Sequence, residues 1–290
     1  MHDVDRMRDE AVRLSRLITK KERQQVSETM SVSSAVKTEV RGNVLLIGLN
    51  RPEKKNALTG EMFQALAEAY ERYDRDDSLR CAVLYGEGGV YCAGVDMTQL
   101  RELVESGALV YGEGDYDPFG IAGIRLSKPL ITAVHGVCFA GGLELALSGE
   151  FIVAAEGTLF GQPEVLRGVF AFFGGAARWV ASVGYANAQR YLLTGHHLDA
   201  TEAHRIGLVQ EVVPAEQLLD RALRLADEIA AAAPMGVRYS LAVSRRAAAA
   251  GLRAAFEITP QLRIAIVSTD DAAEGVRSFE EHRVGVYPGH

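Results

Sequence analysis

Long runs of apolar residues are absent from this sequence, although 48% of its 290 residues are hydrophobic. A transmembrane helix needs about 20 consecutive, mostly apolar residues, so we expect no membrane-spanning helix. The amino-terminal segment is highly charged and includes Asp3, Asp5, Asp9 and Glu10. A signal peptide would have an apolar centre there, and a transit peptide would have few carboxylates. The sequence therefore predicts a cytoplasmic protein.

Cysteine and net positive charge are also scarce. The three cysteines, Cys81, Cys92 and Cys138, are widely spaced among apolar residues and form no CxxC pair. We interpret them as buried, reduced thiols without a metal-binding or nucleophilic role. The formal net charge is −7, which gives no general attraction to nucleic acid or to an anionic membrane. An anionic ligand would therefore need a local basic patch.

Short apolar segments alternate with helical patterns from residue 35 onward. Strands are predicted at 37–40, 43–49, 81–85, 130–134 and 151–155, and helices after the N-cap Thr59 and at 97–106, 142–147, 199–205 and 215–233. This alternation predicts βα units, and hence an α/β fold with a largely parallel sheet.

Two segments fall outside this alternation. Residues 108–119 are rich in glycine and aspartate, which predicts a surface flap. Residues 1–34 combine a possible amphipathic helix at 4–25 with a serine-rich stretch. We interpret residues 1–34 as a mobile appendage.

The stretch Val134–Ala146, VHGVCFAGGLELA, predicts a strand followed by two adjacent glycines and an apolar helix. Backbone N–H groups at a helix start have no partner within the helix and can stabilise a developing oxyanion. Gly141 in this stretch and Val95 in the loop YCAGVDM are the candidate donors, because small neighbours let a ligand approach the backbone. Taken alone, each glycine loop is more often a tight turn than a ligand site.

Two glutamates lie near predicted element boundaries, Glu144 in the first turn of this helix and Glu164 in the segment FGQPE. Two carboxyl groups across a substrate can activate water and supply a proton, if their surroundings set suitable pKa values. The alternative readings are structural. Glu144 would stabilise the helix as a carboxylate near its N-terminus, through the helix macrodipole. Glu164 would be a solvated residue after Pro163.

Five segments occur in a characteristic order: LNRPEKKNALT, YCAGVDM, AVHGVCFAGGLELAL, FGQPEVLRGV and LLTGHHLDATEAHRIGLVQEVVP. Together with the closing SFEEHRVGVYPG, they resemble the crotonase, or enoyl-CoA hydratase/isomerase, superfamily from about residue 35 to 285. Residues 1–34 have no counterpart in that family.

The resemblance implies a fold and a ligand. The fold is an α/β spiral of ββα units over 35–225, with a helical segment over 226–290 that forms trimers, often paired as hexamers. The ligand is an acyl-coenzyme A thioester. Coenzyme A is then part of the substrate, so no separate cofactor and no metal is expected.

The resemblance also assigns roles to residues. The N–H groups of Val95 and Gly141 would hold the thioester oxygen, Glu144 would deprotonate water, and Glu164 would deliver the α-proton. The coenzyme A contacts would come from Arg51, Lys54, Lys55, Ala57, Ala93, Asp96 and Phe279. Phe279 and Tyr287 belong to a segment that often covers the site of a neighbouring subunit, although both could instead pack in the core.

This sequence departs from the family pattern in three places. After QPE it reads GVFAFFGGAARW, which lacks a proline and carries Phe170, Phe172 and Phe173. These aromatic rings could reshape the acyl pocket or fill the core. Val95 stands where alanine is more frequent, which crowds the site, and His135 stands where asparagine is frequent. We interpret His135 as a buried histidine with its hydrogen bonds satisfied.

The leading functional hypothesis is an enoyl-CoA hydratase, a lyase. Double-bond isomerisation, thioester hydrolysis and C–C cleavage are alternatives, because they share an enolate-like oxyanion. A non-catalytic binding protein is a further alternative. Nucleic-acid binding is disfavoured, because the charge is acidic and no stripe of Arg, Lys and aromatic residues occurs.

Overall fold

The computed structural model describes residues 35–99, 103, 111–112 and 114–290. The possible helix at 4–25 lies outside these residues. So does most of the predicted helix at 97–106, of which residues 97–99 and 103 are helical. None of the helices in the described part of the chain combines the length and apolar character needed to cross a bilayer.

A six-stranded sheet with the order β1-β2-β3-β4-β6-β9 forms the largest part of the fold. Its strands are β1 (Val36–Arg41), β2 (Val44–Leu49), β3 (Cys81–Gly86), β4 (Leu130–Val134), β6 (Phe151–Ala155) and β9 (Glu211–Val213). β1 runs antiparallel to β2, whereas all the other neighbouring strands are parallel. The predicted α/β fold with a largely parallel sheet is confirmed.

A smaller, three-stranded sheet has the order β5-β7-β8. Its strands β5 and β7 lead into the two segments that carry the predicted glutamates, Glu144 and Glu164. It consists of β5 (Val137–Phe139), β7 (Leu159–Gly161) and β8 (His197–Asp199). β5 runs parallel to β7, so Phe139 lies opposite Gly161. Because both strands end at the same edge, the segments that follow them begin side by side.

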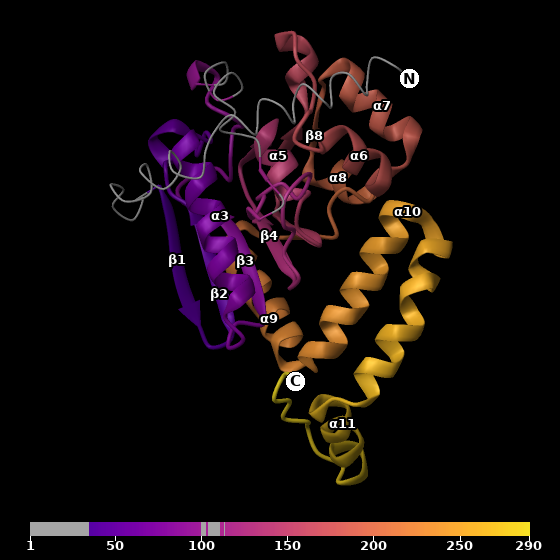
Figure 1. Ribbon diagram of the computed structural model, residues 1–290. Coiled ribbons are helices and arrows are strands. Elements are labelled where there is room, and N and C mark those ends of the chain that lie inside the picture. The colour runs from indigo at the N-terminus through magenta and orange to yellow at the C-terminus, as the bar shows by residue number, and fades with distance from the viewer. Residues whose placement is uncertain (1–34, 100–102, 104–110, 113) are drawn as a thin grey trace.

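Helices cover both faces of the large sheet and extend beyond it (Figure 1). The α-helices are α3 (Gly60–Arg75), α5 (Gly141–Ala146), α6 (Gly175–Val183), α7 (Tyr185–Thr194), α8 (Ala200–Arg205), α9 (Leu218–Ala231), α10 (Pro234–Val267) and α11 (Asp270–Glu280). The described residues also form the 3-10 helices η1 (Pro52–Lys54), η2 (Pro163–Arg167) and η3 (Ala215–Gln217). Thr59 caps α3 as predicted, since its side chain accepts a hydrogen bond from the Met62 N–H at 3.3 Å.

Alternate residues of the strands enter two separate apolar cores, as the period of a strand requires. In β3, Leu84 belongs to the larger core, which lies on the side of α3, and Val83 belongs to a smaller core on the side of α9. Ala222 and Ala226 of α9 are fully buried in this smaller core. The three cysteine thiols are free and buried, as predicted.

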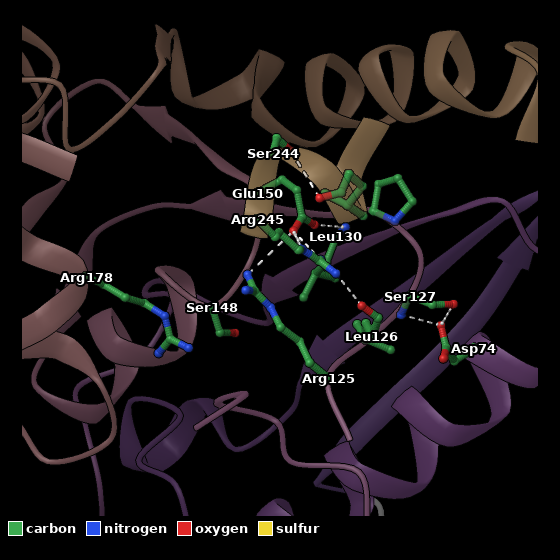
Figure 2. A network of polar contacts seen from close by, with 12 residues as sticks. Asp74, Arg125, Leu126, Ser127, Leu130, Ser148, Glu150, Arg178, Ser244 and Arg245 are labelled. Atoms are coloured by element: carbon green, nitrogen blue, oxygen red, sulfur yellow. Dashed lines mark hydrogen bonds and ion pairs between the residues drawn. The ribbon is translucent and has the colours of Figure 1, made fainter. Parts of the chain in front are cut away.

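The carboxyl-terminal helices α10 and α11 stand to one side of the sheets (Figure 1). Figure 2 shows polar contacts between α10 and the residues around β4: the Arg245 guanidinium donates to Glu150 and to the Leu126 carbonyl. Glu150 also accepts the Leu130 N–H at 2.7 Å, at the start of β4. The predicted boundary between residues 225 and 226 falls inside α9.

The predicted surface flap at 108–119 is wrong for its last residues, because Tyr116, Asp117 and Phe119 are buried. The Asp117 carboxylate accepts the N–H groups of Phe119, Ile121 and Ala122 at 2.8, 2.7 and 2.9 Å. A loop whose N–H groups are satisfied in this way can be buried without penalty. Composition alone could not distinguish it from a surface loop.

His135 also differs from the prediction, since it is only partly buried. One ring nitrogen, Nε2, lies 2.8 Å from the Gly88 carbonyl oxygen. The histidine therefore has the hydrogen bond that was expected but not the full burial.

Candidate active site

Two backbone N–H groups from separate loops lie next to each other at the start of α5. A Cβ atom placed on Gly141 would lie 2.8 Å from Val95 Cγ2 and 3.5 Å from Val95 N. Gly94, with a φ of 112°, lets its loop approach this closely, and Leu58 fixes the loop through hydrogen bonds on both sides of Val95. Among the described residues, neither the Val95 N–H nor the Gly141 N–H donates to a protein acceptor. Both are available to a ligand atom placed between the loops.

Ala140, the residue before α5, has an unusual backbone conformation, with φ 50° and ψ −129°. Such a conformation costs a residue with a Cβ atom roughly 1–3 kcal/mol, and it persists only where the surroundings enforce it. The Ala140 N–H donates to the Gly161 carbonyl at 2.9 Å, which ties the start of α5 to the end of β7. The strain at Ala140 therefore accompanies the turn that exposes the Gly141 N–H.

Glu144 is a buried carboxyl group, with only 1% of its surface exposed. Its Oε1 atom accepts the N–H of Gly175, at the start of α6, at 2.9 Å. The pKa of Glu144 is raised to about 8, chiefly by burial, which outweighs the lowering effect of the Gly175 hydrogen bond; the charge of Glu164 contributes to the rise. A carboxyl group with this pKa can exchange a proton near neutral pH.

Glu164, in η2, is partly buried and is held by a chain of two hydrogen bonds. The Gln162 side-chain amide donates to Glu164 Oε1 at 2.6 Å, and the Trp179 indole N–H donates to Gln162 Oε1 at 3.1 Å. Glu164 Oε2 is buried and has no protein partner. Burial raises the pKa of Glu164 as well. One carboxyl oxygen is therefore fixed, and the other is available to a ligand.

Both glutamates and both N–H donors line one cavity of about 160 Å³. The lining residues are Ala93, Val95, Met97, Ala140, Gly141, Glu144, Pro163, Glu164, Arg167, Val169, Phe170, Phe172 and Phe173. The structure thus brings together three segments that lie far apart in the sequence, namely Ala93 with Val95, Gly141 with Glu144, and Glu164.

Three phenylalanines form one wall of this cavity, and they differ in burial. Phe173 is buried and stacks on Phe119 with ring centroids 4.4 Å apart, while Phe63 lies against both rings. Phe170 is 64% exposed, and Phe172 lies between Phe170 and Phe173. The Phe173 ring therefore fills the core and bounds the cavity at once, so the two sequence-based alternatives for these aromatic residues are not exclusive.

The predicted coenzyme A loop adjoins the cavity without lining it. The Arg51 guanidinium pairs with Asp96 at 2.9 Å and donates to the Ala57 carbonyl at 3.1 Å. Ala93, which lines the cavity, donates its N–H to the Lys55 carbonyl at 3.0 Å. The Lys54 and Lys55 residues are exposed.

The described residues include no cluster of three or more His, Cys, Asp or Glu side chains that could hold a metal ion. The cavity lining presents two carboxyl groups with raised pKa values, two backbone donors and one arginine, Arg167.

A family model described as enoyl-CoA hydratase/isomerase matches residues 39–289. The chain belongs to the enoyl-CoA hydratase/isomerase family. Its fold is the crotonase fold: a crystal structure of a probable enoyl-CoA hydratase/isomerase from Mycobacterium abscessus superposes with a TM-score of 0.85 at 40% identity, covering 89% of this chain and 99% of the other.

Two curated relatives match most of the chain. Enoyl-CoA hydratase EchA19 of Mycobacterium tuberculosis is 39% identical over 84% of this chain and 93% of its own length. Mevalonyl-coenzyme A hydratase SIDH of Beauveria bassiana is 35% identical over 84% of this chain and 91% of its own length. Both names describe hydratases, and they differ in the acyl group.

Of the predicted site residues, Phe279 lies on a helix that is far from the cavity of the same chain. It belongs to α11, at the opposite end of the molecule from α5 in Figure 1, and its side chain lies outside the described residues. The chain after α11 is also held far from the cavity, because Arg80, just before β3, donates to the Tyr287 carbonyl at 2.7 Å. The cavity instead lies beyond the opposite, carboxyl ends of the parallel strands.

The sequence did not reveal three features of this hydratase/isomerase family site. The Gly175 N–H and the Gln162 amide each form a hydrogen bond with a glutamate, and no local pattern links Gly175 to a residue 31 positions earlier. The third feature is Arg167, which lines the cavity. The sequence does show it as the single cation of the segment FGQPEVLRGV.

Proposed function

We propose that this protein is an enoyl-CoA hydratase, a lyase that adds water across the double bond of a 2-enoyl-CoA thioester. One observation carries the proposal: two glutamates with raised pKa values line a cavity beside two backbone N–H groups that lack protein acceptors. Hydration needs a base for water, an acid for the α-carbon and donors for the thioester oxygen. The cavity supplies each of these groups.

The thioester oxygen lies between the Val95 and Gly141 N–H groups, where negative charge develops as the enolate forms. Removing one such donor typically costs about 3–4 kcal/mol of transition-state stabilisation. Both donors are backbone groups, so their positions depend on the loop geometry rather than on a side chain. The coenzyme A portion leaves the cavity past Ala93 towards Arg51, Lys54 and Lys55, whose charges suit phosphate groups.

The two carboxyl groups move one proton in a balanced cycle. Glu144 takes a proton from water as the water oxygen bonds to the β-carbon, and the electrons of the double bond move into the enolate. The α-carbon then takes a proton from Glu164. This leaves the proton of the pair on Glu144, and exchange with solvent, in which Glu144 loses a proton and Glu164 gains one, restores the starting state. Because burial raises both pKa values, the pair retains a proton near neutral pH. Hydration starts from the form of the pair in which this proton lies on Glu164 and Glu144 is ionised.

The test is hydration of crotonyl-CoA, followed by the loss of enoyl absorbance. Glu144→Gln and Glu164→Gln should each lower kcat by about 10²–10⁴-fold, because each removes one proton-transfer step, while acyl-CoA binding persists. Glu216→Gln, in the exposed η3 helix, is the matched control and should be fully active. Normal turnover by both site variants would refute the proposal.

Double-bond isomerisation of an acyl-CoA is the main alternative reaction. Isomerisation uses the same oxyanion donors but requires only one carboxyl group as base. The second glutamate, held by Gln162 and Trp179, therefore favours hydration.

We further propose a homotrimer, or a pair of trimers, working in the cytoplasm. A neighbouring subunit would then bring Phe279 to the coenzyme A site, because α11 of the same chain stands far from α5 (Figure 1).

A further inference from the structure

The Arg167 guanidinium is the one cationic group that lines the cavity, among the residues that the structure describes. It has no hydrogen bond and no ion pair with any of them. The other arginines around the site are occupied. Arg51 pairs with Asp96, and Arg178 donates to the carbonyls of Phe119 and Phe173. Within the described part of the chain, the positive charge of Arg167 on the cavity lining thus has no ion-pair partner.

Arg167 lines the cavity from the segment that carries Glu164 rather than from the coenzyme A loop. It ends η2, the helix that carries Glu164, and is followed by Val169 and Phe170, which also line the cavity. The coenzyme A loop meets the cavity at Ala93. A thioester held between the two N–H donors would therefore direct its acyl chain past Glu164 towards Arg167.

We propose that Arg167 selects short enoyl-CoA substrates whose acyl chain ends in a carboxylate. This inference rests on the proposed hydratase function and narrows its substrate class. An exposed guanidinium binds a carboxylate through paired N–H donors, and the pairing is favoured where apolar walls exclude water. Phe170 and Phe172 supply such walls beside Arg167.

The cavity volume limits the length of the chain. At about 160 Å³, it is comparable to an engineered apolar cavity of roughly 150 Å³ that accepts benzene, or about six non-hydrogen atoms. The glutaconyl group has about that many non-hydrogen atoms beyond its thioester carbonyl. Its carboxylate would reach the rim of the cavity, where Arg167 is exposed.

The first experiment compares glutaconyl-CoA with pentenoyl-CoA, which has the same chain length and a neutral end. The wild-type protein should prefer glutaconyl-CoA in kcat/KM. Arg167→Leu should lower that preference about tenfold or more, a change equivalent to about 1.4 kcal/mol, and Arg167→Lys should keep part of it. The preference should also fall as salt is added, because the pair is near solvent. Arg224→Leu, which removes an exposed arginine of α9 that pairs with none of the described residues, should leave it unchanged.

The second experiment measures binding without chemistry, with the saturated analogues glutaryl-CoA and valeryl-CoA and with free coenzyme A. Weaker binding of glutaryl-CoA alone in Arg167→Leu supports the inference. Equal loss for all three ligands would mean that Arg167 contacts a coenzyme A phosphate, and no loss would mean that it contacts only solvent; either result overturns it. If neither enoyl-CoA is hydrated while glutaryl-CoA still binds selectively through Arg167, the hydratase proposal fails and the recognition of a carboxylate stands.

Discussion

At the scale of single residues, the burial of Glu144 should lower the stability of the fold. An unfolded glutamate releases its proton near its ordinary pKa of 4.5, whereas burial raises the pKa of Glu144 in the folded protein to about 8. Between these values the folded state retains a proton that the unfolded state has lost. Folding stability therefore falls as pH rises through this window and levels off above about 8.

Glu144→Gln should remove this pH dependence while its side-chain carbonyl still accepts the Gly175 N–H. We expect the variant to be more stable than the wild type by roughly 2–5 kcal/mol at pH 8, since each unit of pKa shift corresponds to about 1.36 kcal/mol. The difference should shrink towards pH 5. Denaturant unfolding at the two pH values measures it. An equal stability difference at both would contradict the burial argument.

Gly141 carries a second prediction at this scale. An alanine Cβ there would lie 2.8 Å from Val95 Cγ2 and 3.5 Å from Val95 N, so Gly141→Ala forces the Val95 side chain or one of the two loops to shift and places a methyl group beside both N–H donors. We expect kcat/KM for crotonyl-CoA to fall about 10–10³-fold, in line with the loss of an oxyanion donor. Gly89→Ala is the matched control, because its new Cβ would meet no atom within 4 Å. Unchanged activity in Gly141→Ala would argue against the oxyanion role.

At the scale of elements, α10 depends on a few polar contacts for its position beside the core. Arg245 joins α10 to Glu150 and to the Leu126 carbonyl (Figure 2), and the Arg245 and Glu150 side chains are only 18% and 16% exposed. Arg245→Met would leave a partly buried carboxylate short of its main partner. That loss should cost about 1–3 kcal/mol.

Hydrogen exchange measures this effect locally. Amides in residues 234–250 should exchange faster in Arg245→Met, while those of β3 and β4 should be little changed. Arg246→Met, which alters the exposed neighbouring residue, is the control. Equal exchange of α10 in both variants would show that contacts other than that of Arg245, such as the hydrogen bond from Arg238 to Ser127, hold this helix.

The elements themselves were largely predictable, because each depends on local sequence. The strands β2, β3 and β4 are apolar runs, and Thr59 is a recognisable cap for α3. The glutamates and N–H donors could be proposed from motifs. The burial of Phe119 and the hydrogen bond from Gly175 to Glu144 could not, because they arise when distant segments pack together.

At the scale of the whole molecule, the carboxyl-terminal segment and the cavity lie at opposite ends of the fold. If a neighbouring subunit supplies Phe279, then Phe279→Ala and Glu144→Gln damage different chains of one site. We expect mixed, reassembled oligomers of the two variants to regain activity, since some sites would receive an intact copy of each residue.

The control for this mixing experiment is the pair Glu144→Gln and Glu164→Gln. Both residues line the cavity of a single chain, so their mixture should regain nothing. If the mixture of Phe279→Ala and Glu144→Gln is no more active than either variant alone, Phe279 acts within its own chain.

Trp179 has a further use that follows from its hydrogen bond. It is the single tryptophan of the sequence, it is fully buried, and only Gln162 separates its indole N–H from Glu164. Indole emission responds to changes in its immediate surroundings. The protein therefore carries a built-in fluorescent probe two hydrogen bonds from the proposed acid, and unlabelled acyl-CoA can be titrated by its intrinsic emission.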